Sequence, residues 1–223
     1  MSDTYLPSAT EQSIVVLGSF NPAIFHPSWF LANELVRQSD LEPLEKRFVV
    51  SPDATVFSSK WFELRALQRR VSFHATDPGM DLPLRDLVRS TFQYLEHTPI
   101  TAFGFNCTEV YAMGSAEEAT AVIGKLAPKS LWDTYLESAS VEQVVAAGVN
   151  DGMPLRFSVE AHSNVVTINT NQHYDVPDEI RGRSTDTTSV QFINDRLTSD
   201  WETFLEYVRT TTKKLIAVTA GAR

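Results

Sequence analysis

The chain has 223 residues, of which 43% are hydrophobic and 21% charged, as expected for a globular protein that buries its own core. Lys and Arg number 19 against 28 Asp and Glu, and the net charge of −9 disfavours binding to nucleic acid or to an anionic membrane. The single cysteine, Cys107, excludes an intramolecular disulfide and a thiolate zinc cluster. No signal peptide or membrane-spanning apolar stretch is recognised, so we expect a cytosolic protein.

The first half of the chain predicts strands and helices in a regular order. Apolar runs and alternating residues indicate strands, and apolar residues three or four positions apart indicate helices that pack on one face. The expected elements are a polar tail at 1–11, a strand at 13–19, a short helix from Pro27, one or two strands at 48–59 broken at Pro52-Asp53, a hairpin at 61–76 and a helix over Leu84–Leu95.

The second half predicts a similar series. The expected elements are a strand at 100–106, a helix capped by Ser115 and Glu118 that runs to Leu126, a strand at 140–149, a turn at Asn150–Pro154, a second hairpin at 156–171, a polar loop at 175–189, and a final helix with Val190, Ile193, Leu197, Trp201, Phe204 and Val208 on one stripe. The loop carries Gly182 between Arg181 and Arg183, and it is either a mobile contact element or a connector.

The two hairpins repeat each other at a constant offset. Each has two alternating strands around a two-residue turn, Gln68-Arg69 or Ser163-Asn164, and corresponding apolar positions lie about 95 residues apart (157 minus 62). Phe62, Leu64, Ala66, Val71 and Phe73 correspond to Phe157, Val159, Ala161, Val166 and Ile168. We therefore predict an α+β fold of two internally duplicated units, 12–99 and 100–218. Each unit has a strand, a helix, three or four strands and a helix, with mainly antiparallel sheet and helices on one face.

This layout and one segment resemble known proteins. The order of elements resembles the duplicated saddle of TATA-box-binding-protein-like domains, in layout alone, and no nucleic-acid-binding residue transfers. The segment Leu84–Asn106 resembles the helix-to-strand signature of a sporadically distributed bacterial family without assigned function. That family offers no catalytic residue to transfer. Its patchy distribution implies an accessory gene, such as one in a mobile-element or phage-defence locus.

Hairpin residues that alternate with the core positions form a predicted polar sheet face. Its candidate ligand- or partner-binding residues are Glu63, Arg65, His74, Arg156, Glu160 and Asn169. Cross-strand pairing should place Glu63 opposite His74, and Glu160 opposite Thr167. The face is either a binding platform for a ligand or partner chain, or a solvated sheet face with ordinary cross-strand pairs.

Catalytic chemistry has less support in the sequence. His74 beside Glu63 would form an acid–base pair, because a neighbouring carboxylate raises the pKa of a histidine and orients its ring. Cys107 is expected to be a small buried hydrophobe, since no activating base is identified for it. No phosphate-binding loop, dinucleotide glycine motif, zinc-protease motif or nucleophile elbow occurs. His162 and His173 lie at opposite ends of the second hairpin and should not share a metal.

The expected function is a non-enzymatic binding or protein-interaction module without cofactor or metal. Its expected partner is another protein or a copy of itself, with nucleic acid and membrane disfavoured. The alternatives are a small-molecule sensor with a cleft between the halves, or a hydrolytic enzyme that uses Glu63, Arg65 and His74. An enzyme or sensor should have a pocket with converging polar groups and perturbed pKa values, whereas an interaction module should have an edge strand or flat surface with an apolar patch.

Overall fold

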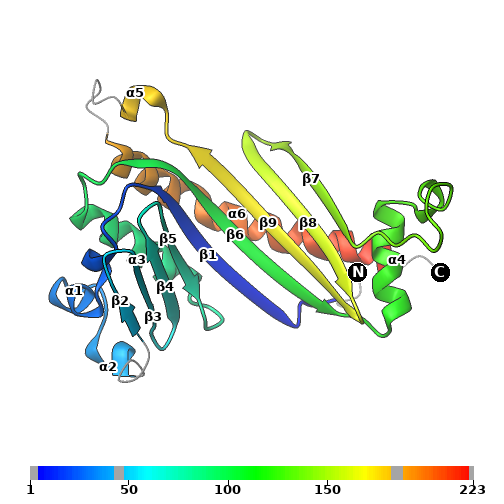
Figure 1. The fold of residues 1–223 in the computed structure, drawn as a ribbon, viewed down its shortest axis with the longest axis horizontal. Helices are drawn as coiled ribbons and strands as arrows, with labels where there is room; N and C mark the ends of the chain where they lie inside the picture. Colours follow the sequence, from blue (N-terminus) through cyan, green and yellow to red (C-terminus); the bar gives the residue numbers. More distant parts are fainter. Residues whose placement is uncertain (1–4, 43–47, 182–187, 221–223) are drawn as a thin grey trace. The chain divides into compact units, whose positions relative to one another are not determined.

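The computed structural model describes residues 5–42, 48–181 and 188–220 (Figure 1). The strands in these ranges are β1 (Ala9–Gly18), β2 (Phe48–Val50), β3 (Ala54–Ser58), β4 (Phe62–Leu67), β5 (Arg70–Ala75), β6 (Ile100–Ala112), β7 (Gln143–Asn150), β8 (Met153–His162) and β9 (Val165–Asp175). The helices are α1 (Pro27–Ala32), α2 (Gln38–Leu41), α3 (Asp81–Tyr94), α4 (Ala116–Leu126), α5 (Asp178–Arg181) and α6 (Ser189–Ala220), with 3-10 turns η1 (Pro22–Phe25) and η3 (Lys129–Leu131).

The strands form a sheet in the order β2-β3-β4-β5-β1-β6-β9-β8-β7. The pairs β1–β5, β2–β3, β3–β4, β4–β5, β7–β8 and β8–β9 are antiparallel. Both hairpin turns lie where the sequence predicted them, because Leu67 pairs with Arg70 and His162 pairs with Val165. The predicted fold class, α+β with an antiparallel sheet and helices on one face, is confirmed.

Two strands are longer than the sequence predicted. β1 begins at Ala9, inside the expected polar tail, and β6 continues to Ala112 instead of ending at Asn106. Buried and less buried side chains continue to alternate to the end of β6, where the buried residues are Cys107, Glu109 and Tyr111. A prediction based on apolar residues alone therefore ends this strand at Asn106, because polar residues occupy several of the buried positions that follow.

The contacts of the chain divide it into two compact units. Unit 1 comprises Met1–Thr10, Cys107–Gln172 and Phe204–Arg223, and unit 2 comprises Glu11–Asn106 and His173–Thr203. The elements β1, β6, β9 and α6 contribute residues to both units. Unit 2 thus combines most of the first expected half, 12–99, with a segment from the second, 100–218.

The core of unit 2 is aromatic and closed. The helix-facing residues of the first hairpin, Phe62, Leu64, Ala66, Val71 and Phe73, are all 0% exposed, as the alternation predicted. Phe57 packs edge-on against Phe30 and Phe62, and Phe73 contacts Phe92 of α3. Such edge-to-face pairs add to the stability gained from apolar burial.

The core of unit 1 lies beneath α6, the helix predicted to cover the second hairpin, but near the C-terminal end of that helix. Val159 and Ile168 are buried as expected, at 4% and 0% exposure, and they cluster with Val122 of α4 and Ile216 of α6. Leu197 and Trp201, earlier on the same helix, belong to unit 2. α6 is 32 residues long, and its buried stripe continues past Val208, the last stripe residue identified in the sequence, to Ile216.

Candidate functional site

The predicted polar face of unit 2 has the expected register. Glu63 pairs with His74 across β4 and β5, and Arg65 pairs with Ser72. The row continues on both sides of the pair, from Ser58 on β3 to Ser13 on β1. Arg65 is exposed, whereas Glu63 and His74 are half-buried. The structure therefore brings together Glu63 and His74 as the sequence predicted.

His74 has the opposite pKa shift to the one expected. Burial lowers the pKa of His74 below its usual 6.5, and the charge of Glu63, which raises it, is the smaller effect. The Arg70 charge also lowers this pKa, and Glu11 raises it. His74 is therefore neutral at pH 7. The hydroxyl of Ser58 donates a hydrogen bond to Glu63 at 3.4 Å.

The predicted polar face of unit 1 consists mostly of side chains that bind one another. The amide of Gln143 on β7 donates to Ser158 Oγ at 2.7 Å and also to Glu160 Oε1. Thr108 on β6 donates to Asn169 Oδ1 at 2.7 Å. Glu160 lies opposite Thr167, as predicted. These hydrogen bonds satisfy the polar side chains within the sheet face itself.

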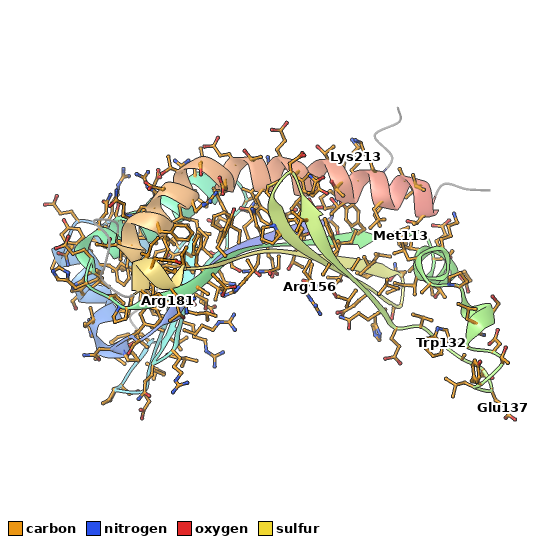
Figure 2. All side chains as sticks on the ribbon, turned by 90° about the horizontal axis from the view of Figure 1, so that it is seen from above. Met113, Trp132, Glu137, Arg156, Arg181 and Lys213 are labelled. Carbon is orange, nitrogen blue, oxygen red and sulfur yellow. The ribbon has the colours of Figure 1, made fainter. Side chains whose placement is uncertain are left out.

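Arg156 is the exposed cation of the unit 1 face. It pairs with Ala147 on β7 and with Asn171 on β9. Figure 2 shows it projecting from the side of the sheet opposite to α6, which carries Lys213. Arg65 and Arg156 are thus the two exposed cations among the six candidate residues.

A buried polar cluster in unit 1 was not predicted. Glu109 on β6 is 1% exposed and accepts hydrogen bonds from Tyr111 Oη at 2.8 Å and from Thr212 Oγ1 on α6. Burial is the largest cause that raises the pKa of Tyr111, and the Glu109 carboxylate raises it further against a lowering by the Thr212 hydrogen bond. Burial, with a smaller effect of Glu109 and an opposing one of Arg209, raises the pKa of Cys107 to about 12. The thiol is therefore protonated and unsuited to nucleophilic attack.

Strand β7 is an open edge of the sheet. It pairs with β8 through eight residues, Gln143–Asn150, and lies last in the strand order of the described chain. No side chain of this strand is ionisable. Val145 and Val149 are 41% and 72% exposed. A Cβ added at Gly148 would meet no described atom within 4 Å, so packing within the chain does not require glycine there.

An apolar hollow lies beneath the same strand. It has a volume of about 180 Å³ and lies on the side of the sheet that faces α4 and α6. Its lining residues are Val144 and Ala146 of β7, Phe157 and Val159 of β8, Leu126 of α4, and Thr211 and Leu215 of α6. We call β7 and this hollow together the β7 edge.

The segment that leads into β7 exposes large apolar side chains. Leu131, Trp132, Tyr135 and Leu136 are 68%, 49%, 81% and 56% exposed. Trp132 and Glu137 mark this stretch in Figure 2, where it stands away from α6. We call residues Leu131–Leu136 the aromatic segment. A cluster of exposed apolar side chains of this kind is typical of an interaction surface.

Three open hollows of unit 2 are lined by residues other than the candidate catalytic ones. They have volumes of about 530, 400 and 500 Å³ and are lined mainly by 94–101, by residues around Asn21, and by Glu34–Arg37. Arg181, which lines the first of the three, donates a hydrogen bond to the carbonyl of Thr101 at 2.8 Å. Gly182 and Arg183, noted in the sequence, lie outside the described residues.

The described residues contain neither a metal-binding group of side chains nor a helix able to span a membrane. No group of three or more His, Cys, Asp or Glu side chains in these ranges is arranged to hold a metal ion. No helix in the same ranges combines the length and apolarity needed to cross a membrane.

Comparisons with known proteins identify no family for this chain. No protein-family model matches it. No curated protein matches it. Among solved structures, the di-domain ARO/CYC BexL from the BE-7585A biosynthetic pathway is 11% identical, with a TM-score of 0.22 over 96% of this chain and 99% of that one. So low a score supports no argument about fold or function.

Proposed function

We propose that this chain is a non-enzymatic protein-interaction module and that its partner binds along the β7 edge. The observation that carries the proposal is the open strand itself: eight residues without an ionisable side chain, paired with β8 on one side and with no described strand on the other. Native proteins usually protect such an edge with charge, proline, a bulge or a covering element. An extended segment of a partner that pairs with an exposed edge is a common mode of protein recognition.

The hollow beneath β7 adds a means of selecting the partner. When a partner strand adds to a sheet edge, main-chain hydrogen bonds supply affinity and pockets for alternate side chains supply specificity. A volume of about 180 Å³ with apolar lining suits an aliphatic or small aromatic side chain. The aromatic segment, seven residues before β7, offers further apolar surface to the same partner.

The two candidate nucleophilic or acid–base groups give the enzyme alternative little support. The lowered pKa of His74 leaves it neutral beside Glu63, and the pKa of about 12 keeps Cys107 protonated. A role in a mobile-element or phage-defence system, drawn from the resemblance of Leu84–Asn106, stays a prediction. Binding through the polar faces at Arg65 and Arg156 is the competing hypothesis.

The proposal is tested by placing charge on the edge strand. A tagged chain is expressed in its native host, and retained proteins are identified, purified and titrated against wild type and Val145→Lys/Val149→Lys. We expect the double variant to weaken binding at least tenfold, because lysine on an edge strand opposes strand addition. Val49→Lys is the matched control, since Val49 is 58% exposed on β2, at the other end of the strand order.

Two further variants separate the edge from the polar faces. Arg65→Glu and Arg156→Glu change exposed cations and should leave the interaction within about twofold of wild type, because rim charges contribute little to affinity. A partner that is insensitive to the β7 variant, but is lost with either arginine variant, would move the binding site to the polar face and contradict the proposal.

A further inference from the structure

We infer that the partner at the β7 edge is a second copy of this chain, paired with it strand to strand and antiparallel across a twofold axis. The inference rests on the proposed function, because it names the partner of the same edge. In the dimer, β7 of each copy extends the sheet of the other. A twofold contact uses the same patch on both subunits, so the patch must be complementary to itself.

Strand order supports an added strand at this position. In unit 2, β3 lies beside β4 of the first hairpin, and β2 covers β3 on its outer side. In unit 1, β7 lies beside β8 of the second hairpin, and no described strand covers it. The place that β2 occupies in unit 2 is therefore open beside β7. In the dimer, the eight-residue β7 of the second copy occupies this place.

Charge favours a copy that meets this one along β7. Each chain carries a net charge of −9, so two copies repel one another wherever acidic side chains face each other. Gln143–Asn150 has no ionisable side chain, and its pairing places no like charges directly opposite one another. The β7 edge is thus a surface on which the self-repulsion of the chain is small.

The side-chain pattern selects one register. A twofold axis through Ala147 pairs Val145 of one copy with Val149 of the other, twice, and pairs Gln143 with Asp151. Both exposed valines are then covered by each other, and they lie on the same sheet face because their positions have equal parity. Gly148 lies opposite Ala146 of the other copy. Its missing side chain, which packing within the chain does not explain, gives room for close approach of a second backbone.

The aromatic segment adds buried area to the interface, because a pair of edge strands alone buries little surface. In the antiparallel pair, the residues preceding β7 in each copy run toward the Asp151 end of the other copy's strand. At about 200 Å² for a fully exposed aromatic side chain, the 49% and 81% exposure of Trp132 and Tyr135 corresponds to roughly 250 Å². A standard interface buries about 800 Å² on each partner. These two side chains would supply about a third of that area, with the strand edge, Leu131 and Leu136 adding to it.

The first test measures the mass of the purified full-length chain in solution by sedimentation and light scattering. At about 100 μM, well above the micromolar dissociation constants of weak specific interfaces, we expect wild type and Val49→Lys at twice 24.9 kDa. Val145→Lys/Val149→Lys should be monomeric, and its urea midpoint should equal that of wild type at protein concentrations low enough to leave both chains monomeric. A second variant, Trp132→Ser/Tyr135→Ser, should weaken dimerisation at least tenfold without altering β7.

The second test fixes the register with introduced cysteines. Directly opposed residues have Cα atoms about 4.5–5.5 Å apart, within disulfide range. Ala147→Cys should therefore give a disulfide-linked dimer under mild oxidation. Val149→Cys should not link to itself, because four residues separate the two copies along the strands, roughly 13 Å. Wild type should stay unlinked, since Cys107 is 2% exposed.

The possible outcomes separate this inference from the proposed function. A wild-type monomer at the highest concentration overturns the second-copy inference, and so does a dimer that persists in Val145→Lys/Val149→Lys. If the monomer nevertheless binds a different protein and loses it in the same variant, the interaction module at β7 stands. If neither self-association nor any other protein depends on β7, both proposals fail. Self-linking at residue 149 but not at 147 would contradict the register and the twofold axis through Ala147.

Discussion

The two hairpins, β4–β5 in unit 2 and β8–β9 in unit 1, have the same alternation but different neighbours. Beyond β4 the sheet continues through β3 to β2, a strand of three residues that ends just before Pro52. Beyond β8 the part of the sheet that the structure describes continues to β7 alone, an uncharged strand of eight residues at the other end of the order. Matching patterns of buried residues therefore specify matching hairpins, but they do not specify what borders them.

The cores of the two units also differ in how completely the side chains of the chain cover the sheet. Aromatic rings cover the helix side of β4–β5. On the helix side of β8, by contrast, Phe157 is only partly buried and lines the hollow under β7. Unit 1 also buries a carboxylate, Glu109, next to two hydroxyl groups. Unit 2 is thus the self-contained region, and unit 1 has the surface that we assign to a partner.

The largest expected effect tests whether the two hairpins are equivalent at their centres. Leu64→Ala and Ile168→Ala should each lower the free energy of unfolding by roughly 2–5 kcal/mol, because both side chains are fully buried. Urea denaturation measures the change, and Val218→Ala, at 73% exposure on α6, is the control. A small effect of Ile168→Ala alone would break the comparison, because the core of unit 1 would then tolerate a cavity that unit 2 does not.

The next effect concerns the buried carboxylate of unit 1. Glu109→Ala should cost roughly 1–3 kcal/mol, because it removes the acceptor for the hydroxyl groups of Tyr111 and Thr212 in a buried site. Glu109→Gln keeps an acceptor oxygen and should cost less, as measured by the same urea midpoints. Equal costs for the two variants would indicate that the negative charge, and not the hydrogen bonding, stabilises the cluster.

Substitutions at two glycines compare β1, a strand inside the sheet, with β7, a strand at its edge. A Cβ at Gly18, on β1, would meet the carbonyl oxygen of Pro99, so Gly18→Ala should destabilise by about 1–3 kcal/mol. Gly148→Ala meets no described atom and should be neutral or stabilising by up to about 1 kcal/mol. Thermal unfolding of the two variants, at a concentration where the chain is monomeric, measures both changes. A clear loss of stability in Gly148→Ala would mean that β7 has an intrachain constraint.

The smallest effect is a pH dependence that belongs to unit 2. Because the folded-state pKa of His74 is below 6.5, the unfolded chain binds the proton more readily. Stability should therefore be unaffected by His74 above pH 6.5 and should fall as the pH decreases below it, by at most about 1.4 kcal/mol per pH unit. His74→Gln should flatten that part of the curve. An unchanged curve in His74→Gln would contradict the assignment.

The sequence predicted the hairpins well because side chains of a strand alternate between two faces. The buried and exposed positions of β4–β5 and β8–β9 follow that alternation, and the cross-strand pairs Glu63–His74 and Glu160–Thr167 follow from the turns. The direction of the His74 pKa shift could not be predicted, because burial depends on neighbours from β1 as well as β4.

The β7 edge escaped prediction for a different physical reason. The run of Val and Ala at 140–149 predicted a strand, but a strand's own residues do not reveal whether a second neighbour pairs with it. That depends on strand order, which non-local contacts determine. The exposed Trp132 and Tyr135 likewise resemble core residues in sequence, since aromatic side chains are more often buried than exposed.

The sharing of α6 between the units has a kinetic consequence. Unit 2 requires His173–Thr203, and unit 1 requires the next residues, which carry Ile216 into its core. Neither unit is a continuous stretch of chain, so neither can finish folding on the ribosome before α6 has emerged. Contacts so distant in sequence slow folding, because the intervening loops must close first. During that interval β7 and the aromatic segment are exposed together, which makes the nascent chain prone to aggregate through the surface where we expect the mature protein to dimerise.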